Sequence, residues 1–345
     1  MKAAVLSGPL DVRIETVATP SIRNNEVLVK VRAAGICGSD MHNYKTGDKP
    51  VAYQPTPVIL GHELSGEVVE VGAVVQGLTV GDKVLGTGIG KCGTCRWCQQ
   101  GRSDLCPNVG LPGYGRSGAF AEYVAVPNPQ LGKTLFKKPE SMSWNEAATI
   151  EPLCVSCFAV EQAMIQPNQT VVVLGAGMIG QGVAQVAKAK GAARVIVSEP
   201  SVKRLAMAKK LGADVALNPK EVDVIKAVME ANSGKKVAVV FECSGVPDAF
   251  RQALQMVQPY GKVMQVAVFE KNVEISSDLM SLMTHTNVSV RGCGGQRWEM
   301  AFELVRSGQV KTADLVTHEF SLDDAKKAFD TQLNSDEAIK VLIKP

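Results

Sequence analysis

The sequence predicts an α/β protein in which a β-rich unit is followed by a doubly wound parallel sheet. Short apolar segments separated by glycine and proline precede Glu151, whereas β-branched strands alternate with helical patterns after Pro152. This alternation predicts a parallel sheet, because a crossover between parallel strands needs a connection as long as a helix. The length of 345 residues agrees, since one hydrophobic core rarely serves more than about 250–300 residues.

The first unit is expected to be a compact, barrel-like group of strands. A Ser7-Gly8-Pro9 turn between two apolar segments is typical of a β-hairpin. Apolar alternation and glycine-containing turns predict further strands downstream. The expected strands are residues 2–6, 12–17, 27–33, 61–71 and a strand entered through Gly81-Asp82-Lys83-Val84.

The second unit is expected to alternate strands and helices, with no internal repeat. Glycines 191 and 212 end two of the helical patterns, as expected where a helix C-terminus needs a left-handed residue. The predicted strands are residues 170–174, 194–197, 237–241, 262–268 and 288–291, and the predicted helices are 178–190, 202–211 and 298–307. A last strand-like segment, residues 339–343, is expected to return to the first unit.

Composition excludes several classes of partner. The formal net charge of +3 is too small to favour nucleic acid or an anionic membrane. No apolar run reaches the roughly 20 residues needed to span a bilayer, and the apolar start turns polar at Ser7, so no signal-peptide core is expected. These features favour a cytoplasmic enzyme.

A glycine motif predicts a dinucleotide site. Gly175-Ala176-Gly177-Met178-Ile179-Gly180 follows an apolar strand and opens a helical pattern, which is the context that gives G-x-G-x-x-G its meaning. Gly175 would make the tight turn, Gly177 would let backbone N–H groups approach a pyrophosphate, and Gly180 would let the helix pack on the strand. The pyrophosphate is then expected at the positive end of the helix dipole.

The end of the next strand bears on the choice of nicotinamide cofactor. A carboxylate at Glu199 can accept hydrogen bonds from a ribose and repels a 2′-phosphate, which favours NAD(H) over NADP(H). Lys203 and Arg204 complicate this preference, since cations can hold a phosphate. The alternative for Glu199 is a solvated first turn of a helix. Arg204 and the later strand-end residues Val266 and Val268 complete the expected cofactor-binding set.

Four cysteines are the most specific signal in the chain. Cys92, Cys95, Cys98 and Cys106 lie within fifteen residues, a spacing too local for a useful disulfide framework. Four thiolates can close a tetrahedron around Zn²⁺ and leave no open position, so a structural zinc is predicted for the lobe at about residues 91–107. The alternatives are redox-active thiols, an iron–sulfur cluster and a nucleic-acid-binding zinc ribbon; spacing and charge disfavour each.

A second metal site is predicted from residues far apart in sequence. Cys37 lies in a Gly35-Ile36-Cys37-Gly38-Ser39-Asp40 turn, His62 and Glu63 begin a strand, and Glu151 precedes Pro152. One thiolate, one imidazole and one carboxylate leave a position open for substrate, as a catalytic zinc requires. The residues alone also allow a core cysteine, a hydrogen-bonded histidine and a glutamate at a helix N-terminus.

The ordered motifs resemble those of the zinc-containing medium-chain alcohol dehydrogenases over the whole chain. They are Gly-Ile-Cys-Gly-Ser-Asp at 35–40, Gly-His-Glu at 61–63, the cysteine lobe, Glu-Pro-Leu at 151–153 and the glycine motif at 175–180. The resemblance implies a GroES-like catalytic domain at 1–153, a Rossmann NAD-binding domain at 154–291 and a return segment at 292–345. Glu-Pro-Leu is similar to the branch of sorbitol, butanediol and galactitol-phosphate dehydrogenases, in which the residue matching Glu151 can be the third zinc ligand and Glu63 lies near or alternately on the metal.

The resemblance also implies an activity and a proton path. The expected enzyme holds two zinc ions per chain, uses NAD(H) and oxidises a small secondary alcohol, such as a polyol or diol, to a ketone. Ser39 and His42 are expected to pass the released proton onward, although Ser39 alone is equally typical of a turn. Relatives imply a homodimer or homotetramer. Cys154, Cys157, Cys243 and Cys293 are expected to be packing residues.

The substrate stays open at this point. Sorbitol-type enzymes usually carry an Arg-aromatic pair where this chain has residues 291–296, and Asn43 replaces a common tyrosine. The Ser198-Glu199-Pro200-Ser201 string is more similar to butanediol dehydrogenases. L-threonine 3-dehydrogenase is the main alternative. A zinc-free quinone reductase and a non-catalytic relative are disfavoured, because Cys37, His62 and Glu151 are all present.

Overall fold

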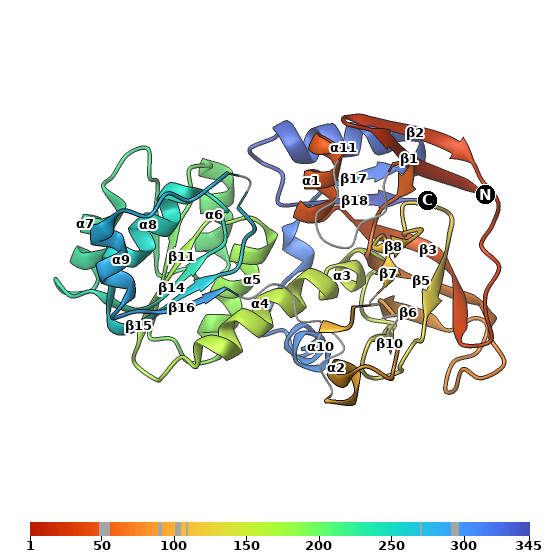
Figure 1. Cartoon of the computed structure of the whole chain (residues 1–345), viewed down its shortest axis with the longest axis horizontal. Coiled ribbons are helices and arrows are strands. Elements are labelled where there is room, and N and C mark those ends of the chain that lie inside the picture. Colours follow the sequence, from red (N-terminus) through yellow and green to blue (C-terminus); the bar gives the residue numbers. More distant parts are fainter. Residues whose placement is uncertain (48–55, 89–91, 101–104, 108–109, 270, 291–296) are drawn as a thin grey trace. The chain divides into compact units, whose positions relative to one another are not determined.

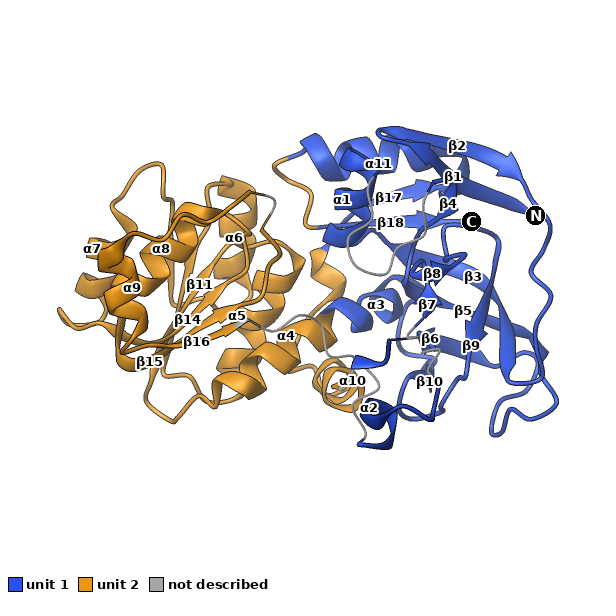
Figure 2. Ribbon diagram, in the orientation of Figure 1, with its two compact units in different colours: residues 1–152, 316–335, 340–345 blue, residues 153–315, 336–339 orange. Residues whose placement is uncertain are grey.

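The computed structural model describes residues 1–47, 56–88, 92–100, 105–107, 110–269, 271–290 and 297–345. Two compact units divide the chain, as coloured in Figure 2. Unit 1 comprises 1–152, 316–335 and 340–345, and unit 2 comprises 153–315 and 336–339. Among the described residues, no helix is both long and apolar enough to cross a membrane.

Unit 1 is built mainly from antiparallel strands. Its larger sheet has the order β10-β6-β5-β3-β18-β17, with β9 also paired to β3, and a smaller sheet has the order β2-β1-β4. The strand bounds are β1 (Lys2–Gly8), β2 (Asp11–Thr16), β3 (Glu26–Gly35), β4 (Val58–Ile59), β5 (Glu63–Val71), β6 (Lys83–Gly86), β7 (Leu111–Pro112), β8 (Gly115–Arg116), β9 (Tyr123–Pro127), β10 (Leu135–Lys137), β17 (Val316–Ser321) and β18 (Lys340–Lys344).

The helices of unit 1 are short and lie between these strands. They are α1 (Gly38–Thr46), α2 (Arg96–Gln99), α3 (Trp144–Ala148), the 3₁₀ turn η3 (Leu322–Asp324) and α11 (Ala325–Asn334), and α4 (Ile150–Ala163) begins in unit 1 and continues into unit 2. Ala148 of α3 packs on Ala33 and Leu342 in one apolar cluster, so burial ties this helix to neighbouring strands β3 and β18 of the larger sheet.

Unit 2 is a six-stranded sheet in which every neighbouring pair is parallel, in the order β13-β12-β11-β14-β15-β16 (Figure 1). The order runs outward in both directions from β11, which is the doubly wound arrangement with its crevice at the carboxyl end of the first strand. The strands are β11 (Thr170–Leu174), β12 (Arg194–Ser198), β13 (Val215–Leu217), β14 (Val237–Glu242), β15 (Val257–Gln265) and β16 (Asn287–Val290).

Helices connect these strands and bury their apolar faces. Val172 and Leu174 of β11 share a core with Val228, Phe250 and Leu279, which come from three successive helices, because alternate residues of a strand point to the same face. The helices are α5 (Met178–Ala189), α6 (Val202–Lys210), α7 (Val224–Ala231), α8 (Pro247–Met256), α9 (Ser277–Met283), α10 (Trp298–Arg306) and the 3₁₀ turn η2 (Ala313–Leu315).

The predicted fold class is confirmed, with differences in detail. The chain leaves unit 2 for unit 1 at Val316, whereas residues 292–345 were expected to return as one segment; α10 belongs to unit 2 and so does the stretch 336–339. Strand β15 runs from Val257 to Gln265 instead of 262–268. It ends early because the N–H groups of Val266 and Ala267 both turn back to the carbonyl of Glu242. Residues 291–296, including Cys293, lie outside the described residues.

Candidate active site

Cys37 is positioned by the start of helix α1. It is the N-cap residue, and its N–H donates to Asp40 Oδ2 at 2.9 Å, which closes a capping box over the first turn. The preceding residue, Ile36, donates its N–H to the carbonyl of Val341 in β18 at 3.0 Å. The cysteine is therefore held between the end of β3 and the first turn of a helix that begins at a defined residue.

Strand pairing brings His62 and Glu63 to Cys37. Glu63 is directly opposite Gly35 in the antiparallel pairing of β3 and β5. One ligand atom from each of Cys37, His62 and Glu63 lies within 4.8 Å of the other two, and both His62 and Glu63 are buried. A Cβ on Gly35 would lie 2.1 Å from Glu63 Oε2, so the glycine before the cysteine makes room for this carboxylate.

Lys340 forms a buried ion pair with Glu63. Its ammonium lies 2.8 Å from Oε1 and 2.6 Å from Oε2 of Glu63, and 2.8 Å from the carbonyl of Ile36. The lysine side chain is 4% exposed and the glutamate 0%, so the pair is nearly free of solvent screening. This lysine was not expected from the sequence, because a single lysine in a C-terminal strand carries no signal of its own.

Glu151 lies near this group without joining it. Its carboxyl is buried, and burial raises the pKa of Glu151 to about 7. It is outside the set of three whose ligand atoms lie within 4.8 Å of one another. Of the two carboxylates expected near the metal, the structure thus groups Glu63 with Cys37 and His62, while Lys340 occupies both oxygens of Glu63.

The electrostatics of the site suit a cation. His62 Nδ1 lies 3.8 Å from Asp40 Oδ1. Although burial opposes a charged ring, the carboxylate of Asp40 and the thiol of Cys37 raise the pKa of His62 well above its usual value. Burial likewise raises the pKa of Asp40. Each of these shifts favours a bound proton, so the site attracts positive charge, and a divalent metal with a thiolate, an imidazole and a carboxylate as ligands would supply that charge instead.

The structure pairs Ser39 with a residue that sequence reasoning missed. The hydroxyl of Tyr114 donates to Ser39 Oγ at 2.7 Å. The ring of Tyr114 also meets the ring of His62 edge-on, with centroids 4.9 Å apart. Within the described part of the chain, no hydrogen bond joins Ser39 to His42, the partner expected from the sequence. A tyrosine 75 residues away offers no pattern by which spacing could have found it.

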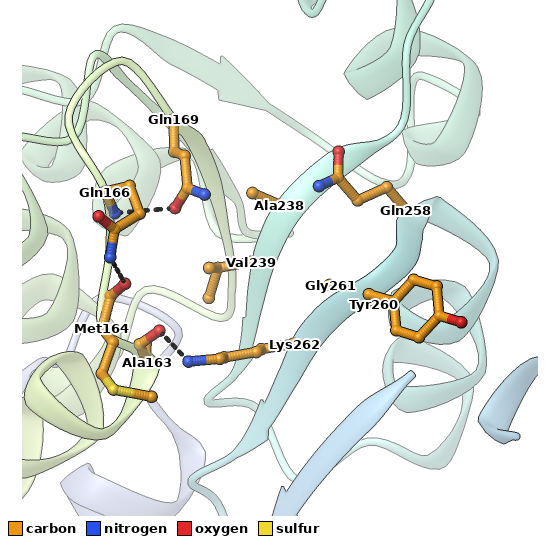
Figure 3. Close-up of a pocket in the computed structure, with 10 residues that line it drawn as sticks. All are labelled: Ala163, Met164, Gln166, Gln169, Ala238, Val239, Gln258, Tyr260, Gly261 and Lys262. Carbon is orange, nitrogen blue, oxygen red and sulfur yellow. Dashed lines mark hydrogen bonds between the residues drawn. The ribbon is translucent and has the colours of Figure 1, made fainter. Parts of the chain in front are cut away.

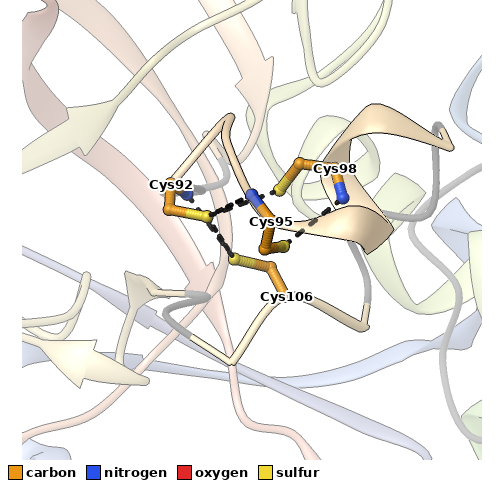
Figure 4. A group of neighbouring side chains, drawn as sticks. All are labelled: Cys92, Cys95, Cys98 and Cys106. Atoms are coloured by element: carbon orange, nitrogen blue, oxygen red, sulfur yellow. Dashed lines mark hydrogen bonds between the residues drawn. The ribbon is translucent and has the colours of Figure 1, made fainter.

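The four lobe cysteines converge as predicted (Figure 4). Their sulfur atoms all lie within 4.8 Å of one another, with Sγ of Cys92 lying 4.0 Å from that of Cys98 and 3.6 Å from that of Cys106. Zinc–sulfur bonds of about 2.3 Å in a tetrahedron place sulfurs about 3.8 Å apart. The observed separations therefore match a four-thiolate zinc site.

Protonation of the thiols supports the same assignment. The backbone N–H of Cys95 donates to Cys92 Sγ at 3.3 Å, and such bonds lower the pKa of Cys92 to about 6. Desolvation raises the pKa of Cys98 to about 12. Neighbouring thiols cannot all ionise unaided, so a full set of thiolates needs a bound cation. Among the other cysteines, Cys154 and Cys157 are buried in α4, and neither belongs to a metal-binding group in the described chain.

The glycine loop has the geometry of a phosphate-binding turn. Gly175 has φ = +94°, and a Cβ on Gly180 would lie 1.9 Å from the carbonyl oxygen of Gly175. Gly177, at the N-cap of α5, has open space where its Cβ would stand. The turn thus requires glycine at 175 and helix packing requires it at 180. Gly177 leaves the N-terminus of α5 accessible to an anion. Met178 and Ile179 form the first turn of the helix.

Glu199 braces the glycine loop. It is 5% exposed, and its carboxylate accepts from the N–H of Ala176 at 2.7 Å and of Ser201 at 3.0 Å. It is therefore not the solvated residue of the alternative reading. Of the two cations expected nearby, Lys203 pairs with Glu337, whereas the bond shown for Arg204 uses its backbone carbonyl, which accepts from Gln181 Nε2 at 2.9 Å.

A second buried carboxylate organises the neighbouring strand ends. Glu242, at the end of β14, accepts from the N–H groups of Ser244 and Gly245 and from Gln265 Nε2 at 2.7 Å. Its carbonyl accepts from Val266 N–H, while Val268 is 80% exposed. Sequence reasoning missed Glu242, because a glutamate at a strand end has no distinctive spacing. It shapes the same carboxyl edge of the sheet as the glycine loop.

A pocket of unit 2 lies away from the glycine loop. It has a volume of about 220 Å³ and is lined by Gln169, Val239, Gln258 and Lys262 among others (Figure 3). Gln169 precedes β11 and Val239 lies near the start of β14, so the pocket is at the end of the sheet opposite the glycine loop. Lys262 Nζ is engaged by the carbonyl of Ala163 at 2.8 Å. The pocket includes none of the expected site residues.

Two protein-family models match this chain. The model described as "Alcohol dehydrogenase GroES-like domain" matches residues 23–140, and the one described as "Zinc-binding dehydrogenase" matches residues 179–307. Together they cover the candidate metal ligands of unit 1 other than Glu151, and most of unit 2 downstream of the glycine turn.

Full-length relatives extend this match. Sorbitol dehydrogenase of Bacillus subtilis is 34% identical over 356 residues, covering 100% of this chain and 97% of the relative. L-threonine 3-dehydrogenase of Pyrococcus abyssi is 38% identical over 321 residues, covering 91% and 90%. The crystal structure of 2R,3R-butanediol dehydrogenase from Bacillus subtilis superposes with a TM-score of 0.86 at 32% identity, covering 100% and 99%. The chain therefore belongs to the zinc-containing medium-chain alcohol dehydrogenase family.

Proposed function

We propose that this chain is a zinc-dependent, NAD-linked dehydrogenase that transfers a hydride from a secondary alcohol to NAD⁺ and yields a ketone. The observation that carries the proposal is the convergence of Cys37, His62 and Glu63 within 4.8 Å, beside a buried Glu151. The substrate class is a polyol, a vicinal diol or a sugar-derived alcohol. Relatives that act on sorbitol and butanediol support this class, and the threonine dehydrogenase relative supports the main alternative.

Two zinc ions per chain are part of the proposal. Cys92, Cys95, Cys98 and Cys106 would hold a structural ion, whereas Cys37 and His62 would hold the catalytic ion together with Glu63 or Glu151. The catalytic ion supplies a Lewis acid for the substrate hydroxyl. Asp40 Oδ1 lies 3.8 Å from His62 Nδ1, beyond hydrogen-bond distance, so its carboxylate would act on the metal-binding imidazole through its charge. Asp40, His62, Glu63 and Glu151 around this position are buried, and Cys37 is partly exposed.

Ser39 is proposed to accept the proton of the substrate hydroxyl. Its hydroxyl lies on the first turn of α1, two residues after Cys37. We expect Ser39→Ala to lower kcat about 10²-fold and to leave the zinc content unchanged. This factor is at the low end of the rate enhancement that a positioned proton-transfer group provides. Turnover and metal analysis on the same preparation make the comparison. Unchanged turnover would remove Ser39 from the mechanism; His42→Ala tests the second expected relay residue in the same way.

The proposed cofactor site uses the carboxyl edge of the parallel sheet in unit 2. The N-terminus of α5 would bind the pyrophosphate, because the space where a Cβ on Gly177 would stand is open. Val266 and Val268 follow β15 at this same edge and would flank the bound dinucleotide. Glu199 holds the N–H of Ala176, and it would disfavour a 2′-phosphate through its charge.

Glu199→Ala tests the cofactor preference. Losing a buried acceptor for two N–H groups should loosen the glycine loop and weaken NAD⁺ binding about tenfold, the value of roughly one buried hydrogen bond. Removing the carboxylate should at the same time bring the binding affinities for NAD⁺ and NADP⁺ closer together, because the charge that repels a 2′-phosphate is lost. Calorimetric titration with both dinucleotides measures the two effects, with Glu230→Ala, an exposed residue at the C-terminal end of α7, as the control. A wild-type preference for NADP⁺ would contradict the proposed role.

The deciding experiment is NADH formation by zinc-replete enzyme across one substrate panel. Butanediols, hexitols, hexitol phosphates, inositols and L-threonine separate the candidate substrates, and NAD⁺ and NADP⁺ are run in parallel. Turnover on one alcohol class supports the proposal and names the substrate. Turnover on threonine alone would favour the alternative function. Light scattering of the same preparation tests the accompanying proposal of a homodimer or homotetramer.

A further inference from the structure

Tyr114 stands on a tight turn that is built against His62. The turn joins β7 to β8, and Leu111 and Tyr114 exchange backbone hydrogen bonds of 2.8 and 3.1 Å. Gly113 has φ = +79°, and a Cβ there would lie 2.9–3.1 Å from backbone atoms of Gly61. The turn therefore lies directly on the residue before His62, and only glycine permits this approach.

An ion pair to a buried carboxylate anchors the far side of the turn. Arg116 Nη2 lies 2.7 Å from Glu26 Oε1, and the Glu26 side chain is 2% exposed. Gly113 N–H also donates to the carbonyl of Arg116 at 3.0 Å. A charge-assisted bond to a buried carboxylate is stronger than a neutral one. The backbone that carries Tyr114 is thus held at both ends, so its side chain starts from a defined position.

The side chain of Tyr114 makes two contacts with the candidate active site. Its hydroxyl donates to Ser39 Oγ at 2.7 Å, and its ring meets His62 at an interplanar angle of 70°. Tyr114 and Ser39 are both only partly buried, so neither hydroxyl needs the other merely to avoid an unsatisfied buried group. The hydrogen bond therefore fixes the side-chain conformation of Ser39 and is not needed to satisfy a buried polar group.

We propose that Tyr114 is a positioning residue, whose hydroxyl fixes Ser39 Oγ so that the remaining donor and acceptor capacity of Ser39 faces the substrate hydroxyl. A serine side chain otherwise has three staggered positions. A hydroxyl has one donor and two acceptor sites, so the bond from Tyr114 leaves Ser39 one lone pair for the incoming proton. Its own hydrogen would then pass to water, which the partly buried Ser39 side chain can reach. This inference rests on the proposed function, because Ser39 takes its role from that reaction.

Tyr114→Phe keeps the ring against His62 and removes only the hydroxyl. We expect kcat to fall about fivefold to tenfold, the effect of losing one neutral hydrogen bond, with KM and zinc content unchanged. In a Ser39→Ala background the same change should have less than about a twofold effect, since a residue acting through Ser39 has nothing left to position. Tyr123→Phe, in strand β9 of the same unit, is the matched control and should match wild type.

A spectroscopic readout tests the contact without turnover. The phenol C–O stretching band of Tyr114, isolated as the infrared difference between wild type and Tyr114→Phe, should shift when Ser39 becomes alanine. An unshifted band, additive losses in the double variant, or loss of zinc from Tyr114→Phe would each overturn the proposal. If the wild type is silent on every alcohol, the proposed function fails, and the infrared comparison still decides whether Tyr114 holds Ser39.

Discussion

Replacing Cys37 with serine is expected to lower the zinc content from two ions per chain to one and to reduce turnover about a thousandfold or more. The thiolate is one of the three groups whose ligand atoms lie within 4.8 Å of one another, and a serine hydroxyl is a far weaker zinc ligand at neutral pH. Lewis-acid activation lowers the reaction barrier by several kcal/mol, and each 1.4 kcal/mol is about a tenfold change in rate.

The separation of the two metal sites makes this result interpretable. Metal analysis and turnover of Cys37→Ser are compared with Cys154→Ala, which alters a buried cysteine outside both metal-binding groups and should retain both ions. Because the cysteine lobe uses four other thiols, its ion should remain in Cys37→Ser. Retention of two zinc ions with normal turnover would show that Cys37 is not a ligand and would remove the basis of the proposed mechanism.

Replacing Lys340 with methionine is expected to lower the free energy of unfolding by about 3–5 kcal/mol, the usual cost of removing one partner of a buried ion pair. The ammonium is bonded to both oxygens of Glu63 and to a backbone carbonyl, and both side chains are almost fully buried. The variant leaves an uncompensated carboxylate in the interior, while the methionine fills most of the volume of the lysine stem.

Denaturant unfolding of the metal-replete protein measures the loss, and two further variants identify its cause. Adding Glu63→Gln to Lys340→Met should recover part of the stability, because the buried charge is then gone. Lys344→Met, in the same strand, removes an exposed pair with Glu319 and should have little effect. If Lys340→Met were as stable as Lys344→Met, the pair would not stabilise unit 1.

Local features were the most predictable from sequence. The cysteine spacing in the lobe and the glycine turn after β11 need only a few neighbouring residues to define their geometry, and the structure brings both together. Strand β11 and helix α5 also lie where the apolar pattern predicts, because burial on a sheet face and a helix face produces distinct periods. Element ends were less predictable, as at β15, where a turn back to Glu242 decides the boundary.

Contacts between distant segments were not predictable in this way. The sequence by itself determined the two-unit α/β architecture, the four-cysteine lobe, the glycine turn and, through the order of its motifs, the family. Only the tertiary structure placed Glu63 opposite Gly35, brought Lys340 to Glu63 across 277 residues and set Tyr114 against Ser39. The physical reason is that strand register and long-range packing decide which side chains meet, whereas periodicity and spacing report only what a segment does with its own neighbours.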